Sequence, residues 1–511
     1  MTKSGNTSVL REMPDTWSAS DAFNDERAQK NGLEMNRRSF LAASVGAAGG
    51  LVLGETRDLA GMTLKQASSL IRTKAVSSVD LTQACLARIG KLQALLNAYI
   101  TVTGDQALDQ ARELDRELQR GKWRGPLHGI PIALKDNIET AGVRTTGASQ
   151  LFKDRVPAED AEVARRLKGA GAILLGKLNL HEFAYGGTSA VTYFGPVHNP
   201  WDATLTPGGS SGGPGAAVAA DLCFASIGTD TAGSIRIPAS YCGIVGLKPT
   251  YGRVSIRGII PLSWSLDHAG PMCKTVEDTA ILLNVVAGYD SQDTTTVDVS
   301  VPDYVRAVAR PTAKLRLGLP RRPFFDDLNP EVGKAIEAAL AVLRKLTGGM
   351  MDVSLPPAAE GPVIFGVEAY TYHRDWITKT PELYEPPIRA ALQRGADIKA
   401  DAYAGALRDL AKARREIRSV FATVDLLVLP TMADPPFKID AGLTRNVSAR
   451  NTLPFDIYGI PVISVPCGFT SAGLPIGLQI AGAPWAEPAV LALAHAYEQA
   501  TQWHARHPKL G

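Results

Sequence analysis

The sequence predicts an α/β protein in which a central mixed, largely parallel sheet is covered by helices on both faces. Short apolar runs bounded by glycine and proline alternate with longer amphipathic stretches, which is typical of strands joined by crossover helices. The hydrophobic fraction of 45% and the charged fraction of 21% are those of an ordinary globular protein. At 511 residues the chain is long enough for one large core with attached segments.

The first half of the chain shows this alternation most clearly. After helices at 64–73, 79–94 and 104–120, the apolar run 129–134 is short and bounded by turn signals, so it predicts a buried strand with Lys135 at its carboxyl end. Further strands are expected at 97–102, 172–175 and 223–227, and further helices at 160–170 and 275–287.

The second half is less regular at first. Residues 301–403 are expected to be a variable insertion that shapes the substrate site, because they differ in composition from the segments around them. They hold a cluster of aromatic residues that could line an apolar pocket or pack within the insertion: Phe365, Tyr370, Tyr372, Trp376, Tyr384 and Tyr403. Strands are expected at 315–319, 425–429, 462–466 and 473–481, and helices at 330–347, 403–422 and 487–500.

Residues 1–61 form an N-terminal extension before the globular pattern begins. Arg37 and Arg38 precede an apolar run from Phe40 to Leu53, which is shorter than the about 20 residues that a membrane span requires. The segment 35–54 therefore resembles a twin-arginine export signal, and we expect a periplasmic protein without stable membrane insertion. A chance arginine pair before a loose apolar helix, in a cytoplasmic protein, is the alternative. Separately, Met35 could be the true start of the chain.

Charge and cysteine content exclude several classes of partner and cofactor. The net charge is only +3, and basic residues do not gather with aromatics, so nucleic acid is not an expected partner. The five cysteines are scattered without a C-x-x-C pair, which argues against a zinc site or a disulfide framework. We expect neither a metal nor an organic cofactor.

Two glycine-rich segments carry the candidate chemistry. The run 207–215 holds five glycines in nine residues, and 228–239 follows closely. Glycine is costly in regular elements and is used where the backbone takes unusual dihedrals or approaches another group closely. The hydroxyls of Ser210, Ser211 and Ser234 are candidate nucleophiles, and the N–H-rich turn before Ser234 is a candidate oxyanion hole.

Three other interpretations of these glycines are open. A phosphate-binding loop would need Lys-Ser or Lys-Thr after the glycines, and neither is present. The match to G-x-S-x-G around Ser211 suggests the nucleophile elbow of α/β-hydrolases, but the late histidines have no supporting pattern. A glycine-rich structural turn with incidental serines is the third.

The run GGSSGGPGAAVAADLCFASIGTDTAGSIRIPA (208–239) resembles the amidase signature over its whole length. The resemblance continues on both sides, in HGIPIALKDNI (128–138), GKLNLHEFAYG (176–186), CGIVGLKPTYGRVS (242–255) and GIPVISVPCG (459–468). It implies a triad of Lys135, Ser210 and Ser234, whose separations of 75 and 24 residues agree with those in the family.

The resemblance also implies a role for each residue. Ser234 would attack the carbonyl carbon, and Ser210, after a cis peptide at Gly209, would relay the proton to Lys135. The N–H groups of Thr231, Ala232, Gly233 and Ser234 would bind the oxyanion. Ala232 departs from the glycine common in relatives, which would make a positive φ there costly.

Other residues near the motif are expected to have supporting roles. Ser211 and Tyr185 are expected at the substrate. Asp230 and Arg236 are expected to form an ion pair that shapes the nucleophile loop, and His181 is expected to pack near the pocket.

These expectations describe an amidase that hydrolyses a small aryl or alkyl amide to an acid and ammonia or an amine. Its partner would be the small-molecule amide, and a homodimer is compatible with the sequence. One alternative is the A subunit of a glutamyl-tRNA amidotransferase, although the family resemblance implies an aspartate in those subunits at the position of His181. A non-catalytic binding protein on the same scaffold is the other.

Overall fold

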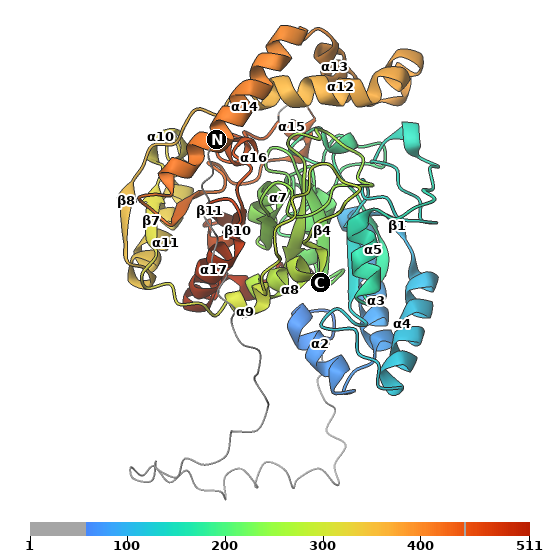
Figure 1. The fold of residues 1–511 in the computed structure, drawn as a ribbon. Coiled ribbons are helices and arrows are strands. Elements are labelled where there is room, and N and C mark those ends of the chain that lie inside the picture. Colours follow the sequence, from blue (N-terminus) through green and yellow to red (C-terminus); the bar gives the residue numbers. More distant parts are fainter. Residues whose placement is uncertain (1–57, 444–445, 511) are drawn as a thin grey trace, which may run out of the picture. The chain divides into compact units, whose positions relative to one another are not determined.

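The computed structural model describes residues 58–443 and 446–510 (Figure 1). The chain divides into two units, residues 1–57 and 58–511, and the second unit contains the sheet and the helices that cover it. The expected export signal at 35–54 lies outside the described residues.

Within the described residues, one sheet of eleven strands forms the centre of this unit, in the order β1-β3-β2-β4-β6-β5-β10-β11-β9-β7-β8. The predicted α/β architecture with a mixed sheet is confirmed. The strands are β1 (Tyr99–Val102), β2 (Pro131–Lys135), β3 (Ile173–Leu178), β4 (Ala225–Asp230), β5 (Val245–Lys248), β6 (His268–Cys273), β7 (Arg316–Leu319), β8 (Gly349–Asp352), β9 (Leu426–Pro430), β10 (Val462–Phe469) and β11 (Pro475–Gly482).

Parallel pairing is limited to two blocks, β3-β2-β4 and β9-β7-β8. The strands between these blocks pair antiparallel, so the sheet is less parallel than the sequence indicates. The main reason is β6, which enters antiparallel to both β4 and β5. Its sequence HAGPMC holds no β-branched residue, so nothing in it signals a strand.

Helices cover both faces of the sheet. β2, β3, β4 and β6 are buried at every residue, which requires cover on each side. The helices of the body are α2 (Leu64–Arg72), α3 (Ser78–Leu96), α4 (Gly104–Gln119), α5 (Glu162–Gly169), α6 (Gly212–Ala219), α7 (Arg236–Cys242), α8 (Val276–Val286), α9 (Tyr304–Ala307), α10 (Arg321–Phe324), α11 (Pro330–Leu346), α15 (Ile439–Gly442), α16 (Leu453–Ile457) and α17 (Glu487–Thr501). In the described part of the chain, no helix has the length and apolar character to cross a membrane.

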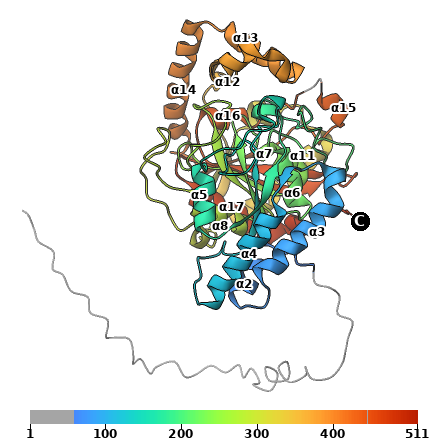
Figure 2. The same cartoon turned by 90° about the vertical axis from the view of Figure 1, so that its right-hand side faces the viewer.

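The segment 301–403 is divided between the sheet and a separate helical layer. β7 and β8 extend the sheet, and α11 packs against β10, so the first part of the segment belongs to the body. The second part is regular rather than irregular: α12 (Gly361–Lys379), α13 (Pro386–Ala396) and, beyond it, α14 (Ala400–Val420). These three helices, which we call the cap, lie together over one end of the sheet (Figures 1 and 2).

Candidate active site

Lys135 ends β2 and is fully buried. β2 and β4 run parallel with Leu134 opposite Ile227, which brings the carboxyl ends of the two strands side by side. Lys135 Nζ consequently lies 2.7 Å from Oγ of Ser210 and 2.7 Å from Oγ1 of Thr229. The backbone carbonyl of Thr229 lies 3.5 Å from the same nitrogen.

These surroundings favour the neutral form of the lysine. Burial lowers the pKa of Lys135 to about 7, although the carboxylates of Asp230 and Asp267 act in the opposite direction. A neutral amine has two N–H donors and one lone pair. The two oxygens of Thr229 can accept the donors, which leaves the lone pair free to accept the proton of Ser210.

Asp136 faces away from Lys135, as expected for adjacent strand residues. Its carboxylate accepts a hydrogen bond from the Thr146 N–H at 2.8 Å and lies 3.5 Å from Nζ of Lys177. Asp136 is therefore paired with Lys177 and not with Lys135.

The first glycine-rich segment holds Ser210 and Ser211 close to other backbone. The Gly209–Ser210 peptide is cis, as the family resemblance implies. Ser211 donates its N–H to the carbonyl of Ser234 at 3.2 Å and its hydroxyl to the carbonyl of Thr229 at 3.1 Å. A Cβ at Gly213 would lie 2.3 Å from the carbonyl oxygen of Asn179, so glycine is required there.

Of the three residues expected to form a triad, Ser234 is the one that lines a cavity, and 7% of its surface is exposed. The N–H groups of Thr231, Ala232 and Ser234 make no hydrogen bond within the described residues. The N–H of Gly233, in contrast, donates to Oδ1 of Asp230 at 2.5 Å. Gly233 was expected to contribute to the oxyanion hole, but this donor is already engaged in holding the loop.

Ala232 fits the loop without strain, because it is absent from the residues with positive φ. Its carbonyl accepts a hydrogen bond from the hydroxyl of Thr452 at 2.6 Å. The turn therefore does not require a glycine at this position.

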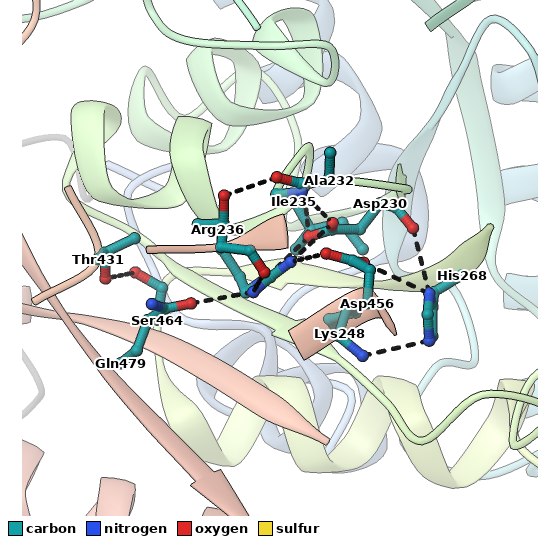
Figure 3. Close-up of polar contacts among 12 residues, drawn as sticks. Asp230, Ala232, Ile235, Arg236, Lys248, His268, Thr431, Asp456, Ser464 and Gln479 are labelled. Carbon is teal, nitrogen blue, oxygen red and sulfur yellow. Dashed lines mark hydrogen bonds and ion pairs between the residues drawn. The ribbon is translucent and has the colours of Figure 1, made fainter. Parts of the chain in front are cut away.

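The predicted ion pair between Asp230 and Arg236 is present and fully buried (Figure 3). The Asp230 carboxylate lies 3.0 Å from both Nε and Nη2 of Arg236, and it also accepts the N–H of Ile235 at 3.0 Å. Arg236 Nη2 reaches Asp456 at 2.5 Å. Since Asp230 binds the N–H groups on both sides of Ser234, the ion pair fixes the nucleophile loop.

The protonation states in this network differ between the two acids. Burial opposes ionisation of both, but the adjacent Arg236 charge holds the pKa of Asp230 below its usual range. Burial raises the pKa of Asp456 well above its usual range. The Arg236 charge therefore favours the ionised form of Asp230, whereas burial disfavours the ionised form of Asp456.

A cavity of about 230 Å³ opens beside Ser234. Its wall is formed by Ala184, Tyr185, Gly186, Gly187, Thr231, Ala232, Ser234, Ile237, Leu262, Pro362, Phe365, Asn446, Val447, Ala449 and Leu453. Among the described residues, no charged side chain belongs to this wall. An uncharged, largely apolar group fits such a surface.

Only some of the other residues expected at the substrate line the cavity. Tyr185 lines the cavity, whereas Ser211 is buried behind it and serves the loop. Of the aromatic cluster, Phe365 lines the cavity and lies edge-on to Tyr185, with ring centroids 5.8 Å apart. Trp376 instead packs edge-on against Phe152 of the body at 5.2 Å.

Two functional positions were missed in the sequence. Thr229 contacts Lys135 through both of its oxygens, and its place in the second glycine-rich segment was the available signal. Asp267 accepts the hydroxyl of Thr231 at 2.5 Å, and the available signal was its place in LDHAGP (266–271), which also resembles the amidase signature family. Burial raises the pKa of Asp267 to about 7.

The five cysteines are buried and free, in agreement with their expected packing role. No group of three or more His, Cys, Asp or Glu side chains that could hold a metal occurs in residues 58–443 and 446–510. His181 is also buried, and its Nδ1 accepts the N–H of Ser189 at 3.1 Å.

Comparison with curated proteins finds relatives that this chain matches over almost their whole length. The chain is 40% identical over 482 residues to the A subunit of glutamyl-tRNA(Gln) amidotransferase from Moorella thermoacetica, covering 88% of this chain and 99% of that protein. It is 41% identical over 485 residues to the corresponding protein from Geotalea daltonii, covering 89% and 100%.

Solved structures with the same fold include amidases. Peptide amidase from Stenotrophomonas maltophilia has a TM-score of 0.80 and 33% identity, covering 88% of this chain and 98% of that one. The A subunit of glutamyl-tRNA(Gln) amidotransferase from Thermotoga maritima has a TM-score of 0.75 and 33% identity, covering 87% and 95%. The family model described as Amidase matches residues 80–491, and the chain therefore belongs to the amidase signature family.

Proposed function

We propose that this protein hydrolyses a carboxylic amide with an apolar acyl group through an acyl-enzyme on Ser234. The observation that carries the proposal is the cavity of about 230 Å³ beside Ser234, whose lining residues are uncharged as far as the structure describes them. The buried Lys135, with its nitrogen 2.7 Å from Oγ of Ser210, provides the base.

The chemistry follows from these groups. Ser234 gives its proton to Ser210, which passes its own proton to neutral Lys135, while Ser234 Oγ bonds to the carbonyl carbon. The N–H groups of Thr231, Ala232 and Ser234, which have no partner among the described residues, would donate to the charge that develops on the carbonyl oxygen. One such donor is worth about 3–4 kcal/mol. The carbon–nitrogen bond then breaks, and the leaving amine takes the proton back from Lys135 through Ser210. Water then attacks the acyl carbon and gives its proton to Lys135 through Ser210. The acid leaves as Ser234 takes a proton back from Lys135 along the same path.

A second candidate is the A subunit of a glutamyl-tRNA(Gln) amidotransferase. It is favoured by the curated relatives, whose length is covered to 99% and 100% at about 40% identity. Free glutamine, however, carries an ammonium and a carboxylate that both need charged partners when they leave water. Because the described residues of the wall beside Ser234 carry no charge, we infer that this cavity suits an apolar amide better than glutamine.

Ammonia release by the purified chain alone separates the two candidates. We expect turnover of phenylacetamide and related apolar amides that exceeds turnover of L-glutamine at least tenfold. Ser234→Ala is the matched control and should abolish both activities. Release of ammonia from glutamine alone, or only after addition of partner proteins, would favour the amidotransferase.

A further inference from the structure

A second cavity, of about 280 Å³, adjoins the catalytic cavity. The two share Tyr185 and Asn446, so these residues form a common wall between them. The second cavity has a different character, because its wall includes the guanidinium-bearing Arg394 of cap helix α13 as well as His181.

The polar groups of this second cavity are hydrogen-bond donors. Arg394 is exposed, and its guanidinium has no ion pair or hydrogen bond within the described residues. Asn446 uses its Oδ1 to accept the N–H of Gly187 at 2.8 Å, which leaves its amide N–H groups free among the described residues. His181 Nδ1 accepts the N–H of Ser189, so the ring proton is on Nε2.

The described part of this wall carries a positive charge and no negative one. Among the described residues, neither Asp nor Glu lines the second cavity. The charge of Arg394 reaches the shared wall: burial raises the pKa of the Tyr185 phenol, and Arg394 acts against that rise. An unpaired cation together with donors and without a competing acid is the setting in which a carboxylate binds.

We propose that the second cavity binds a carboxylate of the substrate through Arg394, so that the substrate is an amide with an apolar part beside Ser234 and an acidic group beyond Tyr185. The proposal deepens the proposed function and rests on it for the position of the scissile bond. A zwitterionic amino acid would fit less well, because its ammonium group would need an acidic partner, which the described wall does not provide.

Binding to the Ser234→Ala protein tests the carboxylate site independently of turnover. Two matched pairs of ligands place the acid on either side of the amide: N-phenylacetylglycine with N-propylphenylacetamide, and succinanilic acid with butyranilide. Because Arg394 is exposed, we expect the acid of one pair to bind about fivefold more tightly than its neutral partner. Arg394→Gln in the same background should reduce this ratio to about one.

The matched control is Arg389→Gln, which removes another arginine of α13 that does not line the cavity. It should keep the preference for the acid. Arg394→Glu should reverse the preference. Equal acid-to-neutral ratios in the Ser234→Ala protein and its Arg394→Gln derivative would overturn the proposal. Failure of the unmodified protein to hydrolyse any neutral amide would instead count against the proposed function, because the binding experiment does not depend on hydrolysis.

Discussion

Lys135 Nζ lies 2.7 Å from Oγ of Ser210, in a site from which water is excluded at both residues. This distance is short enough for direct proton transfer. The same nitrogen is held on its other side by Thr229, so its lone pair points to the serine when the amine is neutral. The contact supports the proposed role of Lys135 as the base, and the rival role is that of a cation that only holds the loops together.

Replacing Lys135 by arginine separates these two roles. Arginine keeps the charge and the donors but is not a base near neutral pH. We expect kcat to fall at least about 100-fold, the low end of general-base contributions. The position is fully buried, so the unfolding midpoint must be measured in parallel, and Lys135→Met provides a second variant of similar volume without a base. Near-normal turnover by a folded Lys135→Arg protein would show that the lysine is not the base.

The pH dependence follows from the lowered pKa of Lys135, about 7 instead of 10.5. The neutral form is the active one, so kcat/KM should rise about tenfold per pH unit below pH 7 and level off above it. An unperturbed lysine would give a rise that continues to about pH 10. A pH–rate profile between pH 5 and 10 distinguishes a lysine with a pKa of about 7 from an unperturbed one. The residual activity of Lys135→Met should not change around pH 7.

The same shift affects stability in a defined direction. The folded pKa lies below the unfolded one, so the unfolded chain binds more protons between about 7 and 10.5. The contribution of Lys135 to the free energy of unfolding should therefore increase with pH across that window.

The sequence was sufficient for most strands and for bringing Lys135 and Ser210 together, because these depend on local patterns. The apolar run before Lys135 and the glycine-rich segments are contiguous, and they fix both the strand and the loop chemistry. β6 could not be predicted, since the residues of His268–Cys273 lack β propensity and gain strand geometry only by pairing with β4 and β5.

The details of the site depend on contacts between distant segments, which explains the errors. Gly233 was expected to be a free donor, but Asp230 accepts its N–H. Phe365 and Trp376 are equally aromatic in sequence, yet the direction of α12 brings only the first to the catalytic cavity. Such choices are made by the packing of the cap and not by composition.

The buried Arg236 should contribute strongly to stability. Replacement by methionine leaves Asp230 without its partner in a site closed to water, and breaking such a pair costs about 3–5 kcal/mol. Arg316→Met is the matched control, because Arg316 also approaches one carboxylate through Nε and Nη2 but is 51% exposed. That loss should be about 0–1 kcal/mol. Urea unfolding measures both, and equal losses would mean that the buried pair has no special role.

The export signal stays a prediction that depends on Arg37 and Arg38. Replacement of both by lysine should retain the protein in the cytoplasm, because the twin-arginine route requires the arginine pair. Cell fractionation followed by activity measurement gives the distribution. Unchanged fractionation would contradict export, and the specific activity of the double variant serves as the control for folding.

Glu368 connects the cap to the loop that holds Thr231, one of the proposed oxyanion donors, through Ser263 and Asp267. Its carboxylate in α12 accepts the Ser263 and Ser265 hydroxyls, each at 2.6 Å, and the Tyr403 hydroxyl at 2.8 Å. Asp267 accepts the N–H of Ser263 at 3.1 Å and the hydroxyl of Thr231 at 2.5 Å.

Glu368→Gln introduces donors where the Ser263, Ser265 and Tyr403 hydroxyls already donate, so the loop should loosen and the Thr231 N–H should lose its alignment. We expect kcat to fall about tenfold with little change in KM, because a donor to the oxyanion acts mainly in the transition state. Glu382→Gln, an exposed change in the turn between α12 and α13, should leave kcat unaltered. If the two residues act through one path, adding Thr231→Val to Glu368→Gln should cost less than the sum of the single changes. A lower unfolding midpoint with unchanged kcat would show that Glu368 only holds the cap in place.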